Sequence, residues 1–226
     1  MRTFAKFVVK SIEDLIKGFQ ELLNFLKKGW PEIKKAIDET FVSFKSLKEK
    51  LIKSVKGLSK KDLDWMSARK PGDLGGKILK ESQIRRLRGL LKEKGIILIV
   101  EEDLKSVKRL FKPVYLDGEL ISTADDLFYY MRKNGFAGGF DGVNKQLILP
   151  KDATELVAFH EMAHVKQFEE LGDIFHTLET WEKETYVWEQ IWANRSLWTN
   201  EELQHSLNYV NSRRKKAGIE LLKITL

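Results

Sequence analysis

The chain has 226 residues, 42% of them apolar, with 40 basic side chains, 33 acidic side chains and no cysteine. These values are typical of a globular chain with a substantial core, and they exclude wholesale disorder and fibrous repeats. Because cysteine is absent, disulfides, thiolate metal sites and cysteine nucleophiles are excluded. Any metal ion must therefore be held by His, Asp or Glu.

The net charge of +7 is unevenly distributed along the chain. Residues 1–66 carry 15 basic and 9 acidic side chains, residues 67–153 carry 17 and 12, and residues 154–226 carry 8 and 12. The basic front could bind an anionic surface or an acidic protein, but lysines on solvated helix faces are the simpler interpretation. No nucleic-acid-binding signature accompanies it, so we expect no specific nucleic-acid partner.

The apolar runs are too short for a membrane anchor. None approaches the roughly 18 residues that span a bilayer. The first ten residues are interrupted by Arg2, Lys6 and Lys10, which leaves no apolar core for a signal peptide. We therefore expect neither a membrane-spanning helix nor a Sec-type signal.

The spacing of apolar residues divides the chain into three parts. Residues 1–57 have the pattern of two amphipathic helices interrupted at Trp30-Pro31, which predicts a helical hairpin. Simple packing of this hairpin is favoured, and contact of its helices with a membrane is the weaker alternative. A linker rich in Lys, Gly and Pro follows over residues 58–78, and a folded domain over residues 79–226.

The third part mixes helical and strand patterns, so the predicted fold class is α+β with a small mixed or antiparallel sheet. Most of its predicted elements carry recognisable start or stop signals. They are a helix over 81–94 ended by Gly95, a buried strand over 96–100, a helix over 123–133 with Thr123 as N-cap, a hairpin of strands 138–140 and 146–149, and a helix capped by Asp152 and Glu155 and ended by Gly172.

An H-E-x-x-H sequence lies in that last helix, with His160 and His164 on either side of Glu161. Positions i and i+4 of a helix lie one turn apart on the same face, so both imidazoles can face one ion with the glutamate beside it. The motif therefore predicts a metal site. The other two histidines, His176 and His205, are interpreted as solvated or capping side chains.

Two histidines do not complete a catalytic zinc site, which usually takes three protein ligands and one water. The metzincin extension would place a third histidine at position 170, which is Glu170, so that class is excluded. A glutamate from the next predicted helix, residues 180–194, is the remaining source. We favour Glu184, because an aromatic residue one turn later can anchor that helix, while Glu182 and Glu189 remain alternatives.

Further features occur in a fixed order around the motif. They are Gly138-Gly139-Phe140-Asp141, the strand Leu147-Ile148-Leu149, Ala153-Thr154-Glu155 before the motif, Glu182 to Val187 after it, and Thr199 to Leu203 opening a last helix that contains Tyr209. Together with the motif, this set over residues 79–216 resembles the zincin-like metallopeptidase toxin domains of bacterial polymorphic toxins. The N-terminal hairpin lies outside the resemblance.

The resemblance implies Zn²⁺ bound by His160, His164 and Glu184, with Glu161 as general base. It also implies a toxin that cleaves a protein or peptide substrate inside a rival cell. Delivery would use a bacterial secretion system without a Sec signal, and a cognate immunity protein would neutralise the toxin. The alternative is a non-catalytic interaction module on the same scaffold, which binds an acidic protein partner.

Peptide hydrolysis needs a hydrogen-bond donor to the transition-state oxyanion besides the metal. Tyr209 is our choice for this catalytic role, with His205 and Tyr186 as alternatives. An extended substrate is expected to lie along the hairpin at Gly138, Gly139 and Phe140, because glycines allow a second backbone to approach closely.

Overall fold

The computed structural model describes residues 42, 45–46, 57–66, 76–116 and 118–224. The chain divides into two compact units, Met1–Lys56 with Gln167–Leu178, and Gly57–Lys166 with Glu179–Leu226. The hairpin predicted over residues 1–57 lies almost entirely outside the described residues, and the predicted domain boundaries stay predictions. Every residue proposed for the site belongs to the second unit.

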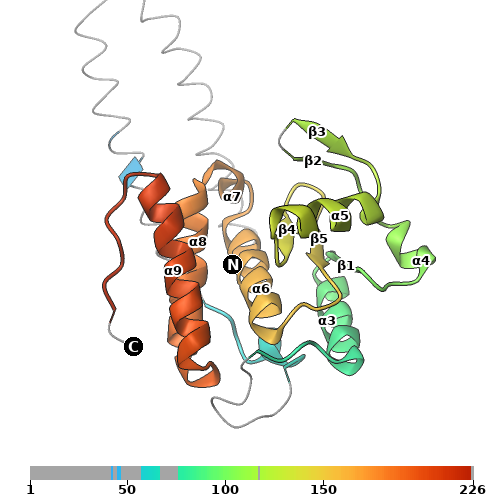
Figure 1. Cartoon of the computed structure of the whole chain (residues 1–226), viewed down its shortest axis with the longest axis horizontal. Coiled ribbons are helices and arrows are strands. Elements are labelled where there is room, and N and C mark those ends of the chain that lie inside the picture. Colours follow the sequence, from blue (N-terminus) through green and yellow to red (C-terminus); the bar gives the residue numbers. More distant parts are fainter. Residues whose placement is uncertain (1–41, 43–44, 47–56, 67–75, 117, 225–226) are drawn as a thin grey trace, which may run out of the picture. The chain divides into compact units, whose positions relative to one another are not determined.

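The described elements confirm the predicted α+β class (Figure 1). Short 3-10 helices lie at Lys61–Leu63 (η1) and Arg195–Leu197 (η2). The strands are β1 (Ile97–Val100), β2 (Val114–Leu116), β3 (Glu119–Ile121), β4 (Gly139–Asp141) and β5 (Gln146–Leu149). The α-helices are α3 (Glu81–Glu93), α4 (Lys105–Lys108), α5 (Ala124–Asn134), α6 (Glu155–Leu171), α7 (Ile174–Thr177), α8 (Thr180–Ala193) and α9 (Asn200–Lys216).

The main sheet has three strands in the order β1-β5-β4. The predicted hairpin is confirmed, since β4 runs antiparallel to β5 with Phe140 opposite Leu147. The other neighbour of β5 is β1, which runs parallel to it with Ile99 opposite Ile148. Strand β5 is therefore central and buried along its whole length, whereas β4 is an edge strand within the described part of the chain.

One apolar cluster joins α5 to this sheet. Its fully or nearly buried members come from β1, β3, β5, α5 and the segment after α4, and they are Ile99, Phe111, Ile121, Ala124, Leu127, Phe128, Met131 and Ile148.

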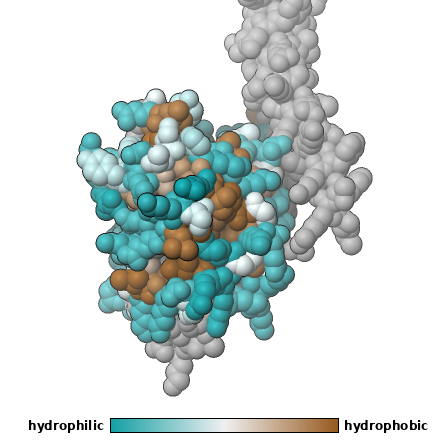
Figure 2. All heavy atoms as spheres, turned by 90° about the vertical axis from the view of Figure 1, so that its right-hand side faces the viewer, coloured by the Kyte–Doolittle hydropathy of each residue, from teal (hydrophilic) through white to brown (hydrophobic). Residues whose placement is uncertain are grey.

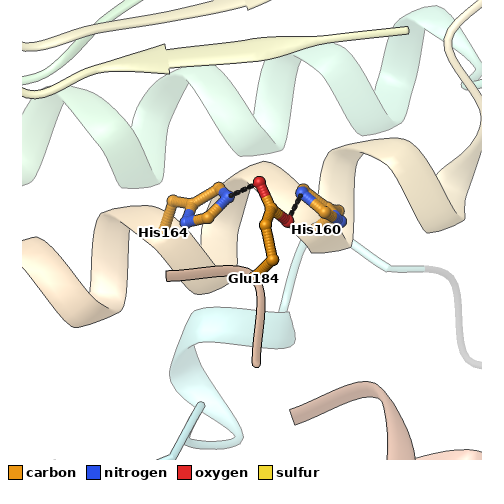
Figure 3. Close-up of side chains that lie close together, drawn as sticks. All are labelled: His160, His164 and Glu184. Carbon is orange, nitrogen blue, oxygen red and sulfur yellow. Dashed lines mark ion pairs between the residues drawn. The ribbon is translucent and has the colours of Figure 1, made fainter. Parts of the chain in front are cut away.

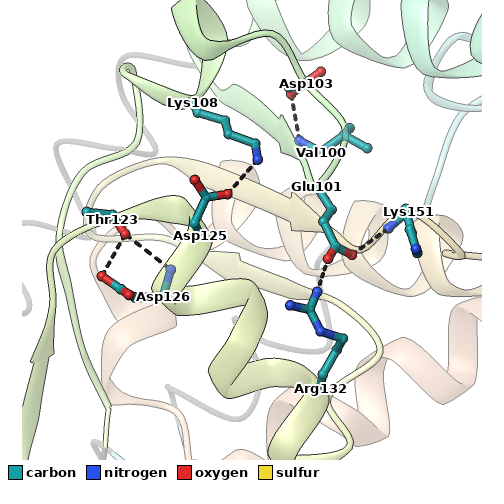
Figure 4. Close-up of polar contacts among 9 residues, drawn as sticks. All are labelled: Val100, Glu101, Asp103, Lys108, Thr123, Asp125, Asp126, Arg132 and Lys151. Atoms are coloured by element: carbon teal, nitrogen blue, oxygen red, sulfur yellow. Dashed lines mark hydrogen bonds and ion pairs between the residues drawn. The ribbon is translucent and has the colours of Figure 1, made fainter.

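Polar contacts also join these elements (Figure 4). Lys108 of α4 pairs with Asp125 of α5 at 2.5 Å, and Arg132 of α5 pairs with Glu101 just after β1. Helices α4 and α5 are thus held beside the sheet.

A second, two-stranded sheet pairs β2 with β3. Its inner face packs on the apolar cluster, while Tyr115 and Leu120, directly opposite each other, point outward and are 73% and 51% exposed. Figure 2 shows apolar areas among mostly hydrophilic surface on one face of the molecule. None of the helices in the described part of the chain is long and apolar enough to cross a membrane.

Several helix ends follow the predicted signals. Thr123 Oγ1 accepts a hydrogen bond from Asp126 N at 3.1 Å and caps α5, which ends at Gly135 in the left-handed region at φ 71°. Gly172, at φ 60°, directly follows the end of α6.

The predicted cap of α6 is wrong. Thr154, not Asp152, caps this helix, because its Oγ1 accepts a hydrogen bond from Val157 N at 3.3 Å. A bridge between Ile78 and Thr154 keeps the chain extended up to that point, so the helix begins later than the local pattern indicates. Glu155 is instead fully buried and accepts a hydrogen bond from Gln83 of α3.

Candidate metal centre

Helix α6 presents both histidines of the motif on one face. Phe159, Met162 and Val165 are fully buried and fix the helix in the core. The His160 and His164 rings then lie 4.9 Å apart between centroids, as the i, i+4 spacing predicts. His160 is half-buried and His164 is buried. The two imidazoles therefore meet at a position that is largely shielded from water.

The Glu184 carboxylate of α8 lies between the two imidazoles (Figure 3). Its Oε2 lies 3.2 Å from His160 Nε2, and its Oε1 lies 3.7 Å from His164 Nε2. The three possible ligand atoms all lie within 4.8 Å of one another. Helices α6 and α8 thus bring together the two histidines and the glutamate favoured from the sequence.

The orientation of α8 separates Glu184 from the two alternative glutamates. Glu182 belongs to the capping box at the start of α8, where its Oε2 accepts a hydrogen bond from Glu179 N at 2.7 Å. Glu189 lies on an exposed part of the helix. Trp188 is buried, in line with its predicted anchoring role.

The two carboxylates of the site differ in their protonation. Burial raises the pKa of the Glu161 carboxyl to about 7, since the charged form loses its water, and the nearby Glu184 charge adds to this effect. Burial would also raise the pKa of Glu184, but its contacts with His160 and His164 outweigh burial and hold that pKa well below its usual range. Glu184 is therefore ionised, as a metal ligand must be.

The first residues of the hairpin approach Glu161 closely. A Cβ added at Gly138 would lie 2.9 Å from Val157 Cγ1 and 3.0 Å from Glu161 Oε1. A Cβ at the next residue, Gly139, would meet no atom within 4 Å. Phe140 follows in β4 and is half-buried. The edge strand β4 therefore begins directly beside the proposed general base.

Tyr209 of α9 lies at the same site. Its hydroxyl oxygen is 3.4 Å from Glu184 Oε1, and its ring centroid is 5.8 Å from that of His160. Burial and the Glu184 charge raise the pKa of Tyr209, which keeps its proton at neutral pH. Of the two alternatives, His205 is exposed on α9 and Tyr186 is buried in α8. Tyr209 therefore lies against the histidine and glutamate cluster.

A family model described as metallopeptidase toxin 4 matches residues 75–216, well over half of the chain. The chain belongs to the metallopeptidase toxin 4 family. The match confirms the resemblance stated from the sequence and supports a metallopeptidase toxin domain, a class of hydrolase whose name implies a metal ion and a protein substrate. No curated protein and no solved structure matches the chain.

The residues of this metallopeptidase toxin 4 domain suit a divalent ion. Two imidazole nitrogens and one carboxylate oxygen are a donor set that zinc commonly takes. Glu184 Oε2 is buried and accepts no hydrogen bond from the described residues, although it lies close to His160. An ion at this point would satisfy that oxygen. Glu161, on the same helix, stays outside the ligand cluster and is available for proton transfer.

Sequence reasoning missed Arg213 of α9. Its Nη2 donates a hydrogen bond to the Tyr209 hydroxyl at 3.2 Å, and its guanidinium lies over the Tyr209 ring, 4.9 Å from the centroid. The available signal was its position one turn after Tyr209, which places both side chains on one helix face. That signal alone does not show that the pair faces α8.

Proposed function

We propose that this metallopeptidase toxin 4 domain is a zinc-dependent endopeptidase that cleaves a protein inside a target cell. The observation that carries the proposal is the convergence of His160, His164 and Glu184 atoms within 4.8 Å of one another. Family membership supports the reaction class, and the donor set supports zinc among the divalent ions.

His160, His164 and Glu184 would hold the ion, which when bound acts as a Lewis acid on a peptide carbonyl and makes a water more acidic. Glu161 accepts the proton of the attacking water and returns it to the leaving amine as the peptide bond breaks. Burial raises the pKa of Glu161 to about 7. A carboxyl with a pKa near the working pH can both accept and return a proton.

An extended substrate segment would add to the sheet along β4. Within the described residues this strand has β5 as its only neighbour, so its outer edge offers backbone donors and acceptors. The edge starts at Gly138, which lies against Glu161, and continues through Gly139 and Phe140. Pairing there would bring a substrate carbonyl toward the histidine and glutamate cluster.

The proposal keeps Tyr209 as the donor to the oxyanion in the transition state, because its ring lies beside His160.

The proposal also includes the partners and the route that a toxin requires. A cognate immunity protein would neutralise the domain in the producing cell, and a bacterial secretion system that needs no Sec signal would deliver it. Membership of a toxin family supports these two points.

The Glu161→Gln variant tests the proposal, because glutamine keeps the shape of the side chain and cannot accept the proton. The purified variant should bind zinc as tightly as the wild type and lose about 10²- to 10⁴-fold in the rate of protein cleavage. A variant that cleaves as fast as the wild type would contradict the assignment. An interaction module that binds an acidic protein would be indifferent to this substitution.

A further inference from the structure

A chain of contacts from α9 holds the third side chain of the metal cluster. Tyr209 Oη lies 3.4 Å from Glu184 Oε1, and Arg213 Nη2 lies 3.2 Å from the same hydroxyl oxygen. We propose that Tyr209 and Arg213 form a positioning pair that fixes the Glu184 carboxylate for metal binding. This inference rests on the proposed function, because the positioning of Glu184 matters only if Glu184 binds the metal ion.

The chemistry of the three groups sets the direction of both hydrogen bonds. A guanidinium has only donors, so Arg213 donates and the Tyr209 hydroxyl accepts. An ionised carboxylate has only acceptors, so in the site without substrate the single proton of the hydroxyl is donated to Glu184. To donate to the oxyanion, as proposed above, the hydroxyl turns this same proton away from Glu184 in the transition state. Arg213 therefore occupies the acceptor side of the phenol and leaves its proton directed at the carboxylate.

The two oxygens of the Glu184 carboxylate have different contacts. Oε1 of Glu184 accepts the hydrogen bond from the Tyr209 hydroxyl, while Oε2 accepts no hydrogen bond from the described residues. A carboxylate held at one oxygen cannot rotate freely about its last bond, so the other oxygen stays beside His160 Nε2. Groups that hold a ligand in this way commonly raise metal affinity about 10- to 100-fold.

Stacking makes the pair rigid. The guanidinium of Arg213 lies 4.9 Å from the Tyr209 ring centroid, and cation–π attraction adds to the hydrogen bond between the same two side chains. The Tyr209 ring also contacts the edge of the His160 ring, with centroids 5.8 Å apart. Tyr209 thus touches two of the three ligand side chains, and Arg213 acts on the site through Tyr209.

The neighbouring residue Arg214 provides a matched control. It also reaches from α9 to α8, where its Nη1 donates to Thr185 Oγ1 at 3.0 Å and its guanidinium lies 5.6 Å from the Trp181 ring centroid. Arg214 therefore shares the general role of joining the two helices. Its hydrogen bonds go to Thr185 and to the Glu220 carbonyl, not to Tyr209.

The experiment measures the dissociation constant for zinc by competition with a chelator, on the full chain, without reference to cleavage. Tyr209→Phe removes only the hydroxyl, and Arg213→Met removes the donor while keeping bulk. Each should weaken zinc binding about tenfold. The double variant should be no weaker than Tyr209→Phe alone, because Arg213 acts through the hydroxyl. Arg213→Lys should recover part of the affinity, and Arg214→Met should bind zinc as the wild type does.

Wild-type affinity in Tyr209→Phe would overturn the inference, and so would losses that add up in the double variant. In either case, zinc binding by the wild type and the loss of cleavage in Glu161→Gln would still support the proposed peptidase. A wild-type protein that binds no zinc would overturn both. Tyr209→Phe is conservative enough to fold, so the test holds even if an arginine variant fails to do so.

Discussion

Gly138 and Glu161 are in contact in a way that only glycine allows. Any side chain at position 138 would begin 3.0 Å from Glu161 Oε1 and 2.9 Å from Val157 Cγ1. The start of the strand that is proposed to receive substrate therefore leaves no room for a side chain between its backbone and the proposed general base. This contact links the start of the hairpin to the motif helix through two residues that are 23 positions apart in the sequence.

Gly138→Ala should lower the cleavage rate at least tenfold while leaving zinc content unchanged. The added methyl group must displace Glu161 or push β4 away from α6, and overpacking of this kind usually costs about 1–3 kcal/mol of stability. Peptidase rates and denaturant unfolding of the same preparation check both effects.

Gly89→Ala controls for the general effect of replacing a glycine. Gly89 is exposed in α3, and an added Cβ would meet no atom within 4 Å. Alanine is the better helix former, so this variant should gain about 0.5–1 kcal/mol of stability and cleave as the wild type does. If Gly138→Ala behaved in the same way, the close approach to Glu161 would have no functional role.

Glu184→Gln should abolish tight zinc binding, whereas Glu182→Ala and Glu189→Ala should keep it. Glu182 caps α8, so its loss should cost about 1 kcal/mol in the free energy of unfolding without loss of metal. Elemental analysis of the three purified variants gives the answer. Stoichiometric zinc in Glu184→Gln together with its loss in either of the others would reassign the third ligand.

The ion pair between Asp62 and Lys94 should make the free energy of unfolding depend on pH. Asp62 is buried, its Oδ1 lies 2.9 Å from Lys94 Nζ, and its Oδ2 accepts hydrogen bonds from Ser59. Burial would raise the pKa of this carboxyl, but the Ser59 hydrogen bonds and Lys94 outweigh it and lower the pKa from 3.8 to about 2. The resulting stabilisation is therefore present above pH 4 and is lost as the pH falls toward 2.

Asp62→Asn should thus be about 1 kcal/mol less stable than the wild type at pH 7, and the difference should shrink below pH 4. Denaturant unfolding of both proteins at a series of pH values measures it. A difference that stays constant down to pH 2 would show that charge on Asp62 is not its cause.

Local signals in the sequence predicted local structure well. Thr123 and Gly135 bound α5 as predicted, and the H-E-x-x-H spacing placed His160 and His164 on one helix face because that geometry depends on four consecutive peptide units. The same reasoning failed at Asp152, because a bridge from the distant Ile78 delays the start of α6.

Contacts between distant elements were harder to predict. Glu184 was chosen over its neighbours from one aromatic anchor, but its distance to the histidines depends on how α8 crosses α6. Arg213 was missed because its role depends on the orientation of α9 against α8. The parallel pairing of β1 with β5 likewise follows from packing of the whole sheet and not from either strand alone.

The central claim is that one ion binds between the α6 histidines and Glu184. Anomalous diffraction at the zinc edge, from crystals grown with one equivalent of Zn²⁺, tests it most directly. The account predicts a single strong peak in contact with His160 Nε2, His164 Nε2 and a Glu184 carboxylate oxygen, and the same peak in Glu161→Gln. A map without a peak at that position, or with the ion bound elsewhere, would contradict it.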